Sequence, residues 1–201
     1  MSADASSAFL RLFIAIAVPE NVRREIGRAQ GQLKRVATPG SIRWTRPEQF
    51  HVTLKFLGDV PSAHVADLDR AVAQACSGRR AMQLSAHGIG FFPDARKPRV
   101  IWVGADDGNG QLSELHRQLE TALQPLAPTE KSERFTGHIT LGRFKPGRPA
   151  AVAKLLERGA ILGEREFGDW QAGTVEIMRS ELTSEGARHI PLASFPLSTG
   201  P

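Results

Sequence analysis

The phrase His-x-Thr-Leu occurs twice in this 201-residue chain, at residues 51–54 and again at residues 138–141. Successive side chains of an extended strand point to opposite faces, so the His and the Thr of each copy share one face. The intervening Val or Ile shares the other face with the closing Leu. A single copy is typical of a half-buried structural strand. Two copies instead indicate two similar strands that contribute to one site.

Two such strands facing each other across a cleft would bring together two imidazoles, His51 and His138, and two hydroxyls, Thr53 and Thr140. Reaction at phosphorus needs one group to accept a proton from the attacking oxygen and another to protonate the leaving oxygen. Histidine titrates near neutral pH, so one imidazole can act as base while the other acts as acid. The sequence does not distinguish the two roles. The hydroxyls would orient phosphoryl oxygens, and a strained 2',3'-cyclic phosphate suits this set of groups.

Longer segments around the motifs, residues 43–58 and 135–144, resemble the paired signatures of the two-histidine (2H) phosphoesterase superfamily. Within it the chain is most similar to the RNA 2',3'-cyclic phosphodiesterase family, first called 2'-5' RNA ligases. The similarity runs from about Leu10 to Leu197. It implies that His51 and His138 are the catalytic pair and that Thr53 and Thr140 bind phosphate.

The resemblance also implies a phosphate-binding role for Arg143 and a substrate contact for Phe13, while Arg46 and Lys55 are further possible contacts beside the first motif. Strict alternation places Lys55 on the His51 face, where it either meets phosphate or extends into water. The same alternation points Arg143 away from His138. A β-bulge or strand end at Gly142 would turn it back toward the site.

The chain is predicted to fold as one bilobal α+β domain over residues 1–201, with the HxTx motifs at 51–54 and 138–141. We expect two pseudo-symmetric lobes of the 2H phosphoesterase type, each an antiparallel sheet with helices on its outer face, enclosing a central cleft. Besides the first motif strand, strands are expected near residues 10–18, 42–45, 82–89, 99–103, 135–144, 174–182 and 189–195. Helices are expected near residues 20–36, 62–76, 110–123 and 150–158.

Composition constrains the setting of the protein more than its chemistry. The formal charge of +5 and a pI near 10.0 are compatible with a polyanionic ligand such as RNA. The single cysteine, Cys76, excludes an internal disulfide and favours a reducing compartment. The apolar stretch at residues 12–18 is too short for a membrane span, which needs about 20 residues, and lacks a signal-peptide cleavage site. We therefore expect a cytoplasmic monomer that does not bind membranes.

The leading hypothesis is metal-independent hydrolysis of RNA or nucleotide 2',3'-cyclic phosphates to 2'-phosphomonoesters, without a cofactor. The resemblance implies a role in RNA processing, with reversible, ATP-independent 2'-5' ligation as a related reaction. One alternative is a module that binds RNA ends without turnover, its bases stacked on aromatic side chains such as Phe13, Trp44, Phe56 and Trp102. Another is a 2H phosphodiesterase for a linear 2'-5' linkage or a small cyclic-phosphate metabolite.

A zinc site at the two motif histidines would need a third ligand, which neither motif supplies. The other four histidines lack a Thr two residues later, so they are expected to be structural or exposed; they are His64, His87, His116 and His189.

Overall fold

A computed structural model describes residues 8–127, 135–147, 152–183 and 186–198 of the chain. Within these residues the strands form a nine-stranded sheet in the order β7-β4-β5-β6-β3-β1-β8-β9, and β2 pairs with β6 outside this path. The strands are β1 (Phe9–Ala17), β2 (Ile42–Trp44), β3 (His51–Pro61), β4 (Met82–Phe92), β5 (Val100–Asp106), β6 (His138–Phe144), β7 (Glu166–Ala172), β8 (Thr174–Thr183) and β9 (Gly186–Pro196). The helices are α1 (Glu20–Val36), α2 (Val65–Cys76), α3 (Gln111–Leu123) and α4 (Val152–Ile161), with 3-10 turns η1 (Pro47–Gln49) and η2 (Ser62–His64).

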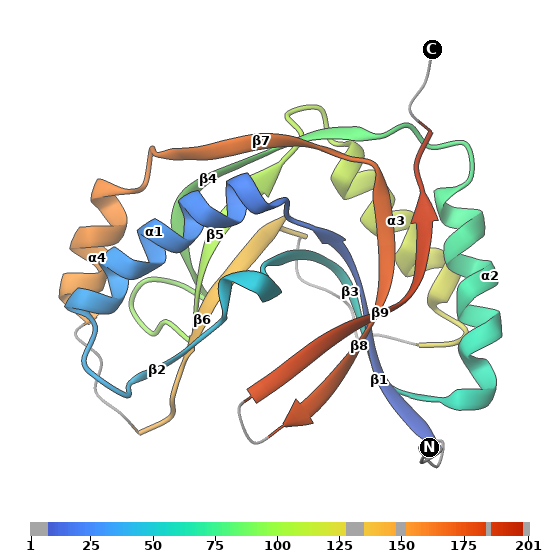
Figure 1. The fold of residues 1–201 in the computed structure, drawn as a ribbon, viewed down its shortest axis with the longest axis horizontal. Coiled ribbons are helices and arrows are strands. Elements are labelled where there is room, and N and C mark those ends of the chain that lie inside the picture. Colours follow the sequence, from blue (N-terminus) through green and yellow to red (C-terminus); the bar gives the residue numbers. More distant parts are fainter. Residues whose placement is uncertain (1–7, 128–134, 148–151, 184–185, 199–201) are drawn as a thin grey trace.

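Strands β3 and β6, which carry the two motifs, meet in the middle of the sheet, with Val52 opposite Ile139. On one side of this junction β6 continues into β5, β4 and β7, and also pairs with β2. On the other side β3 continues into β1, β8 and β9. Helices α1 and α4 lie beside the first group, and α2 and α3 lie beside the second (Figure 1). The predicted α+β architecture of two antiparallel lobes is confirmed.

The lobes interleave along the sequence instead of following one another. Helix α1 follows β1 of one lobe but packs against β7 and α4 of the other. Helix α3 follows β5 of that second lobe but packs against α2 and β3 of the first. The helix layer of each lobe therefore includes a helix that follows, in sequence, a strand of the other lobe. Since a sheet must bury its apolar face against such a layer, the two halves of the sequence depend on each other for their cores.

The apolar spacing along the helices predicts their buried faces correctly. Side chains at i, i+3 and i+4 of an amphipathic helix face the core, and burying each large one stabilises the fold by about 1.5–3 kcal/mol. Apolar side chains at this spacing on α1, α2 and α3 are at most 2% exposed; they are Val22, Ile26, Leu33, Leu68, Val72, Leu112, Leu115 and Leu119. Val65, at the start of α2 on the same face as Leu68, is only partly buried. No helix in the described part of the chain is long and apolar enough to cross a membrane.

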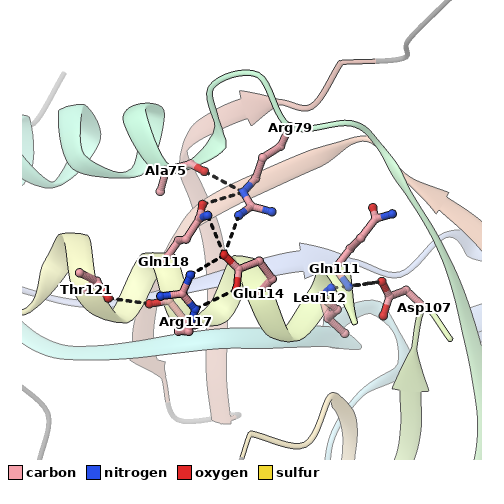
Figure 2. Close-up of polar contacts among 9 residues, drawn as sticks. All are labelled: Ala75, Arg79, Asp107, Gln111, Leu112, Glu114, Arg117, Gln118 and Thr121. Atoms are coloured by element: carbon pink, nitrogen blue, oxygen red, sulfur yellow. Dashed lines mark hydrogen bonds and ion pairs between the residues drawn. The ribbon is translucent and has the colours of Figure 1, made fainter. Parts of the chain in front are cut away.

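Helix α3 begins where the sequence predicts, directly after Gly110, which adopts a left-handed conformation with φ of 83°. The carboxylate of Asp107 accepts hydrogen bonds from the backbone N–H groups of Gln111, at 2.6 Å, and Leu112, at 3.3 Å (Figure 2). These N–H groups have no partner within the helix, and the helix dipole favours a negative charge at this end. Asp107 therefore stabilises the start of α3.

Helices α2 and α3 are linked by the side chain of Arg79 (Figure 2). Its Nε donates to the carbonyl oxygen of Ala75, at 3.1 Å, and to Oε1 of Gln118, at 3.0 Å. Its Nη2 also lies 3.8 Å from Oε1 of Glu114. These contacts hold the end of α2 against α3, which in turn packs behind β3.

Strand β7 is absent from the sequence-based prediction. It lies at an edge of the sheet and pairs with β4, and it contains Gly168 and Asp169, both of which are uncommon in strands. Gly168 has φ of 119° and lies at a register shift between β4 and β7.

The second motif strand begins at His138, three residues later than the expected Phe135. The first two residues of the expected helix 150–158 lie outside the described residues.

Candidate active site

Strand β3 contains a bulge at the last residue of its motif. Ile14 of β1 lies opposite Lys55, and the next residue, Ala15, lies opposite Thr53. Leu54 is therefore an extra residue without a register partner on β1. A bulge of this kind breaks the alternation of side chains, so residues beyond it change face relative to a regular strand.

Strand β6 contains the same bulge at the equivalent place. Ile101 of β5 lies opposite Gly142, and the next residue, Trp102, lies opposite Thr140. Leu141 is the extra residue. The two motifs therefore have the same bulge at the same position as well as the same sequence. The side chain two positions after each Leu consequently points to the same face in both strands.

The bulges determine the positions of two predicted substrate contacts. Arg143, which regular alternation would turn away, lines the same cavity as His51 and Thr140. The expectation that Lys55 reaches the His51 face is wrong, because the bulge turns its side chain into the protein. Lys55 is 3% exposed, and its Nζ lies 2.8 Å from Oε2 of Glu120 on α3.

In each lobe the carbonyl oxygen of the bulged leucine, Leu54 or Leu141, contacts a side chain from the helix that follows a strand of the other lobe. Nδ1 of His116, on α3, lies 2.8 Å from the carbonyl oxygen of Leu54. Nε2 of Gln30, on α1, donates to the carbonyl oxygen of Leu141 at 3.0 Å and to that of Thr45 at 2.7 Å. The N–H of Thr45 also donates to Leu141, at 2.9 Å. Gln30 and His116 thus stabilise the irregularities that orient the site.

Replacing Gln30 with leucine is expected to lower the free energy of unfolding by about 1–3 kcal/mol, because buried carbonyl oxygens lose a donor. Urea unfolding of the variant measures the loss. Gln32→Leu, which makes the same change at a less buried position on the same helix, is the control and should have a much smaller effect. Equal stabilities of the Gln30 variant and the wild type would show that this hydrogen bond does not support the bulge.

The two motif imidazoles are oriented in the same way. Nδ1 of His51 lies 2.7 Å from the carbonyl oxygen of Gln49, and Nδ1 of His138 lies 2.8 Å from that of Thr136. A carbonyl oxygen only accepts, so each Nδ1 carries the hydrogen and each Nε2 remains for a ligand. The side chain of Gln49 donates in turn to the carbonyl oxygen of Ala187 on β9, which fixes the turn before β3.

A cavity of about 680 Å³ lies over the motif strands and is lined by His51, Thr53 and Thr140. His138 is not part of its lining, but it lies on the Thr140 face of β6, two residues earlier. The cavity walls are strongly basic, and none of the described residues that line them is Asp or Glu. The four arginines that line the cavity are Arg11, Arg43, Arg46 and Arg143. Such a wall attracts anions.

Burial and positive neighbours keep both motif histidines neutral. Burial, with smaller contributions from the charges of His189, His138 and Arg143, lowers the pKa of His51 from 6.5 to about 4, against the opposing effect of the hydrogen bond to the Gln49 carbonyl. Burial also lowers the pKa of His138, with a smaller contribution from Arg143. Both imidazoles are therefore available as proton acceptors near pH 7 until an anion raises their pKa values.

Aromatic rings surround each imidazole. The ring of Phe13, on β1, lies 4.9 Å from that of His51 between centroids. The ring of Phe92, on β4, lies 4.9 Å from that of His138, and the ring of Trp102 lies 6.1 Å from it. Phe13 is thus beside the reaction centre, and Arg46 lies in the cavity wall.

His189 is a residue of the cavity wall that was not predicted as part of the site. His189, on β9, was expected to be structural or exposed, but its ring lies 5.2 Å from that of His51 and 4.9 Å from that of Phe13. Its Nδ1 is buried without a hydrogen-bond partner among the described residues. No local signal in the sequence indicates this position, because β9 reaches the cavity only through its pairing with β8 and the pairing of β8 with β1.

Comparisons with known proteins agree with this geometry. A family model described as LigT-like phosphoesterase matches residues 16–102. The RNA 2',3'-cyclic phosphodiesterase of Methanothermobacter thermautotrophicus is 30% identical, over 94% of this chain and 99% of that protein. The chain belongs to the LigT-like phosphoesterase family. This phosphoesterase is also 31% identical to the RNA 2',3'-cyclic phosphodiesterase of Methanocaldococcus jannaschii, over 88% of this chain and 95% of the relative.

The crystal structure of the protein TT0787 from Thermus thermophilus has the same fold as this LigT-like phosphoesterase, with a TM-score of 0.77 and 26% identity, over 94% of this chain and 98% of the other. No group of three or more His, Cys, Asp or Glu side chains within the described residues of the phosphoesterase is arranged to hold a metal ion.

Proposed function

We propose that this phosphoesterase hydrolyses 2',3'-cyclic phosphates at RNA ends, or on nucleotides, to 2'-phosphomonoesters without a metal ion. The observation that carries the proposal is the identical arrangement of His51 and His138, each with its Nδ1 held by the carbonyl two residues earlier and its Nε2 left for a ligand. Thr53, Thr140 and Arg143 supply donors for the non-bridging oxygens of the phosphate. The relatives' activity supports this choice of substrate.

The two bulges add support for a nucleotide ligand. Phe56 and Arg143 occupy equivalent positions, each two residues after the Leu of its motif. Both line the cavity, and Phe56 is 59% exposed. One motif therefore contributes a cation for a phosphate, and the other contributes a flat apolar ring on which a base can stack.

Burial supports different roles for the two histidines. In the forward reaction His51, whose pKa burial lowers to about 4, removes the proton from the attacking water. His138 protonates the 3'-oxygen as it leaves phosphorus. Thr53 and Thr140 orient the phosphate, while Arg143 neutralises the charge that develops on it. The bond from phosphorus to the 2'-oxygen remains intact.

The pH dependence of kcat/KM is expected to be bell-shaped, with its maximum on the acidic side of pH 6.5. Activity falls near pH 4 as His51 becomes protonated, and it falls above the lowered pKa of His138 as the acid is lost. Because the bound phosphate raises both pKa values, the profile of kcat should lie at higher pH. Steady-state rates between roughly pH 4 and pH 8 test this. The prediction would be contradicted if the pH profiles of kcat and kcat/KM coincide, or if either profile is flat over this range.

We further infer that residues 1–201 act as one bilobal domain, as a monomer in the cytoplasm. The interleaved lobes support a single domain, because β8 and β9 complete the group of strands that β1 begins. Cys76, the one cysteine of the chain, is buried, and burial raises the pKa of its thiol to about 11, so it is unreactive. Sedimentation at micromolar concentration tests the monomer.

Substrate choice is tested by comparing kcat/KM for three ligands under one condition. These are a short RNA ending in a 2',3'-cyclic phosphate, the same RNA with an internal linear 2'-5' linkage, and a cyclic-phosphate metabolite that lacks a base. The proposal predicts that the first is preferred, since basic and aromatic walls flank the reaction centre. Binding of the RNA without opening of the ring would instead identify a module that recognises RNA ends.

A further inference from the structure

Two arginines lie directly opposite each other at the junction of β2 and β6. The register pairs Arg43 with Arg143, and both side chains line the cavity. Like charges in directly opposed strand positions repel each other, because their Cβ atoms are only about 4.5–5.5 Å apart. No carboxylate of the described residues forms an ion pair with either arginine. The pair is therefore unfavourable in the empty protein, and an anionic ligand would relieve its repulsion.

The two arginines differ in their electrostatic effect on the motif histidines. Arg143 lowers the pKa values of both His51 and His138, so it is close to both imidazoles. Burial, and then the charge of Arg43, lowers the pKa of Arg143 itself. Arg143 on β6 thus acts on both histidines and, in turn, feels the charge of its cross-strand neighbour Arg43 on β2.

The cavity has more room and more cations than a single phosphate requires. Its volume of about 680 Å³ falls within the range of roughly 300–1,000 Å³ that is typical of sites for small organic ligands. Thr53, Thr140 and Arg143 already supply donors for the reacting phosphate. Arg43 lies directly across from Arg143 on the neighbouring strand β2, in the same basic cavity wall.

We propose that Arg43 binds a second phosphate, the one attached to the 5'-oxygen of the terminal nucleoside, while the histidines and Arg143 hold the 2',3'-cyclic phosphate of the same ribose. This inference rests on the proposed function. The two phosphates occupy opposite ends of one nucleotide, and Arg43 and Arg143 reach the cavity from two paired strands. In an RNA chain the second phosphate is the last internucleotide linkage, so the subsite selects RNA ends over nucleoside 2',3'-cyclic phosphates that lack a 5'-phosphate.

The test compares adenosine 2',3'-cyclic phosphate with two substrates that carry the second phosphate, the first of which adds nothing else. One is the same compound with a 5'-phosphate, and the other is the dinucleotide ApA with a terminal 2',3'-cyclic phosphate. Wild-type kcat/KM should rise about tenfold or more with either addition, as expected for one charge-assisted hydrogen-bonded contact. Arg43→Ala should reduce this gain to less than about threefold, and Arg43→Lys should retain part of it.

Arg35→Ala is the matched control, because it removes an equal charge from an exposed position on α1 outside the cavity. It should keep the wild-type gain. An undiminished gain in Arg43→Ala would overturn the inference. So would an equal loss on all three substrates, which would mean that Arg43 acts on the cyclic phosphate.

Binding of products separates this inference from the proposed hydrolysis. Adenosine 2',5'-bisphosphate should bind the wild type about tenfold more tightly than adenosine 2'-phosphate, and Arg43→Ala should remove most of that difference. Its affinity should also depend more steeply on salt, since each phosphate contact in a single strand adds about 0.7 to the logarithmic slope. If the wild type opens no cyclic phosphate, hydrolysis is contradicted, while these affinities still decide for or against the subsite. Equal affinities of the two nucleotides would overturn it.

Discussion

Replacing His51 or His138 with alanine is expected to lower kcat for opening of the cyclic phosphate by about a thousandfold in each case. A positioned general acid or base typically contributes 10²–10⁴-fold, and each variant removes one of the two groups that move a proton. KM should change much less, because Thr53, Thr140 and Arg143 still contact the phosphate. Initial rates over a range of concentrations of an RNA with a 2',3'-cyclic end measure both constants.

The double variant is expected to be little slower than either single variant, because the two histidines act as a unit. His64→Ala is the matched control: it removes an exposed imidazole at η2 and should leave kcat unchanged. Circular dichroism establishes that each variant is folded. A folded single variant with more than about a tenth of the wild-type kcat would contradict the division of roles between the histidines.

Arg143→Ala is expected to lower kcat/KM by about a hundredfold, since a donor directed at developing negative charge contributes roughly 10²–10³-fold in similar sites. Arg143→Lys should recover part of this loss, because it keeps the charge but not the planar fork of donors. Arg24→Ala, at an exposed position on α1, is the control.

Arg143→Ala is also expected to change the pH dependence of kcat/KM. The charge of Arg143 lowers the pKa values of His51 and His138, so its removal should raise both. Both limbs of the kcat/KM profile of Arg143→Ala should therefore move to higher pH. A loss of activity without this displacement would mean that Arg143 acts elsewhere than beside the two imidazoles.

The sequence predicts the regular parts of this site well. A period of two along an extended strand is enough to put His51 and Thr53 on one face and Val52 on the other, and the structure has this arrangement. The amphipathic helices are also predictable, because their apolar side chains recur with the helical period. These features depend on the local sequence alone.

The irregular parts depend on pairing between strands, which alternation does not describe. The same bulge lies at the last residue of both motifs, yet it has opposite consequences for two predicted contacts. In β3 it turns Lys55 toward Glu120, and in β6 it turns Arg143 toward the cavity. The positions are offset by one residue, since Gly142 is the equivalent of Lys55. Gly142 was a local signal for the second bulge, whereas the first had none.

Long-range packing explains what the sequence analysis missed. His189 enters the cavity from β9, more than a hundred residues after His51, through two successive strand pairings. Arg43 gains its position opposite Arg143 only when β2 pairs with β6. Neither relation leaves a pattern within a short stretch of sequence.

The central claim is that two histidines open a 2',3'-cyclic phosphate without a metal ion. It is tested most directly by following the phosphorus resonance of a short RNA with a cyclic end, in excess chelator, with the wild type and with His51→Ala and His138→Ala. We expect the cyclic resonance to be replaced by that of a 2'-phosphomonoester with the wild type and to persist with both variants. A cyclic resonance that persists with the folded wild type, or disappears equally fast with the variants, would contradict the claim.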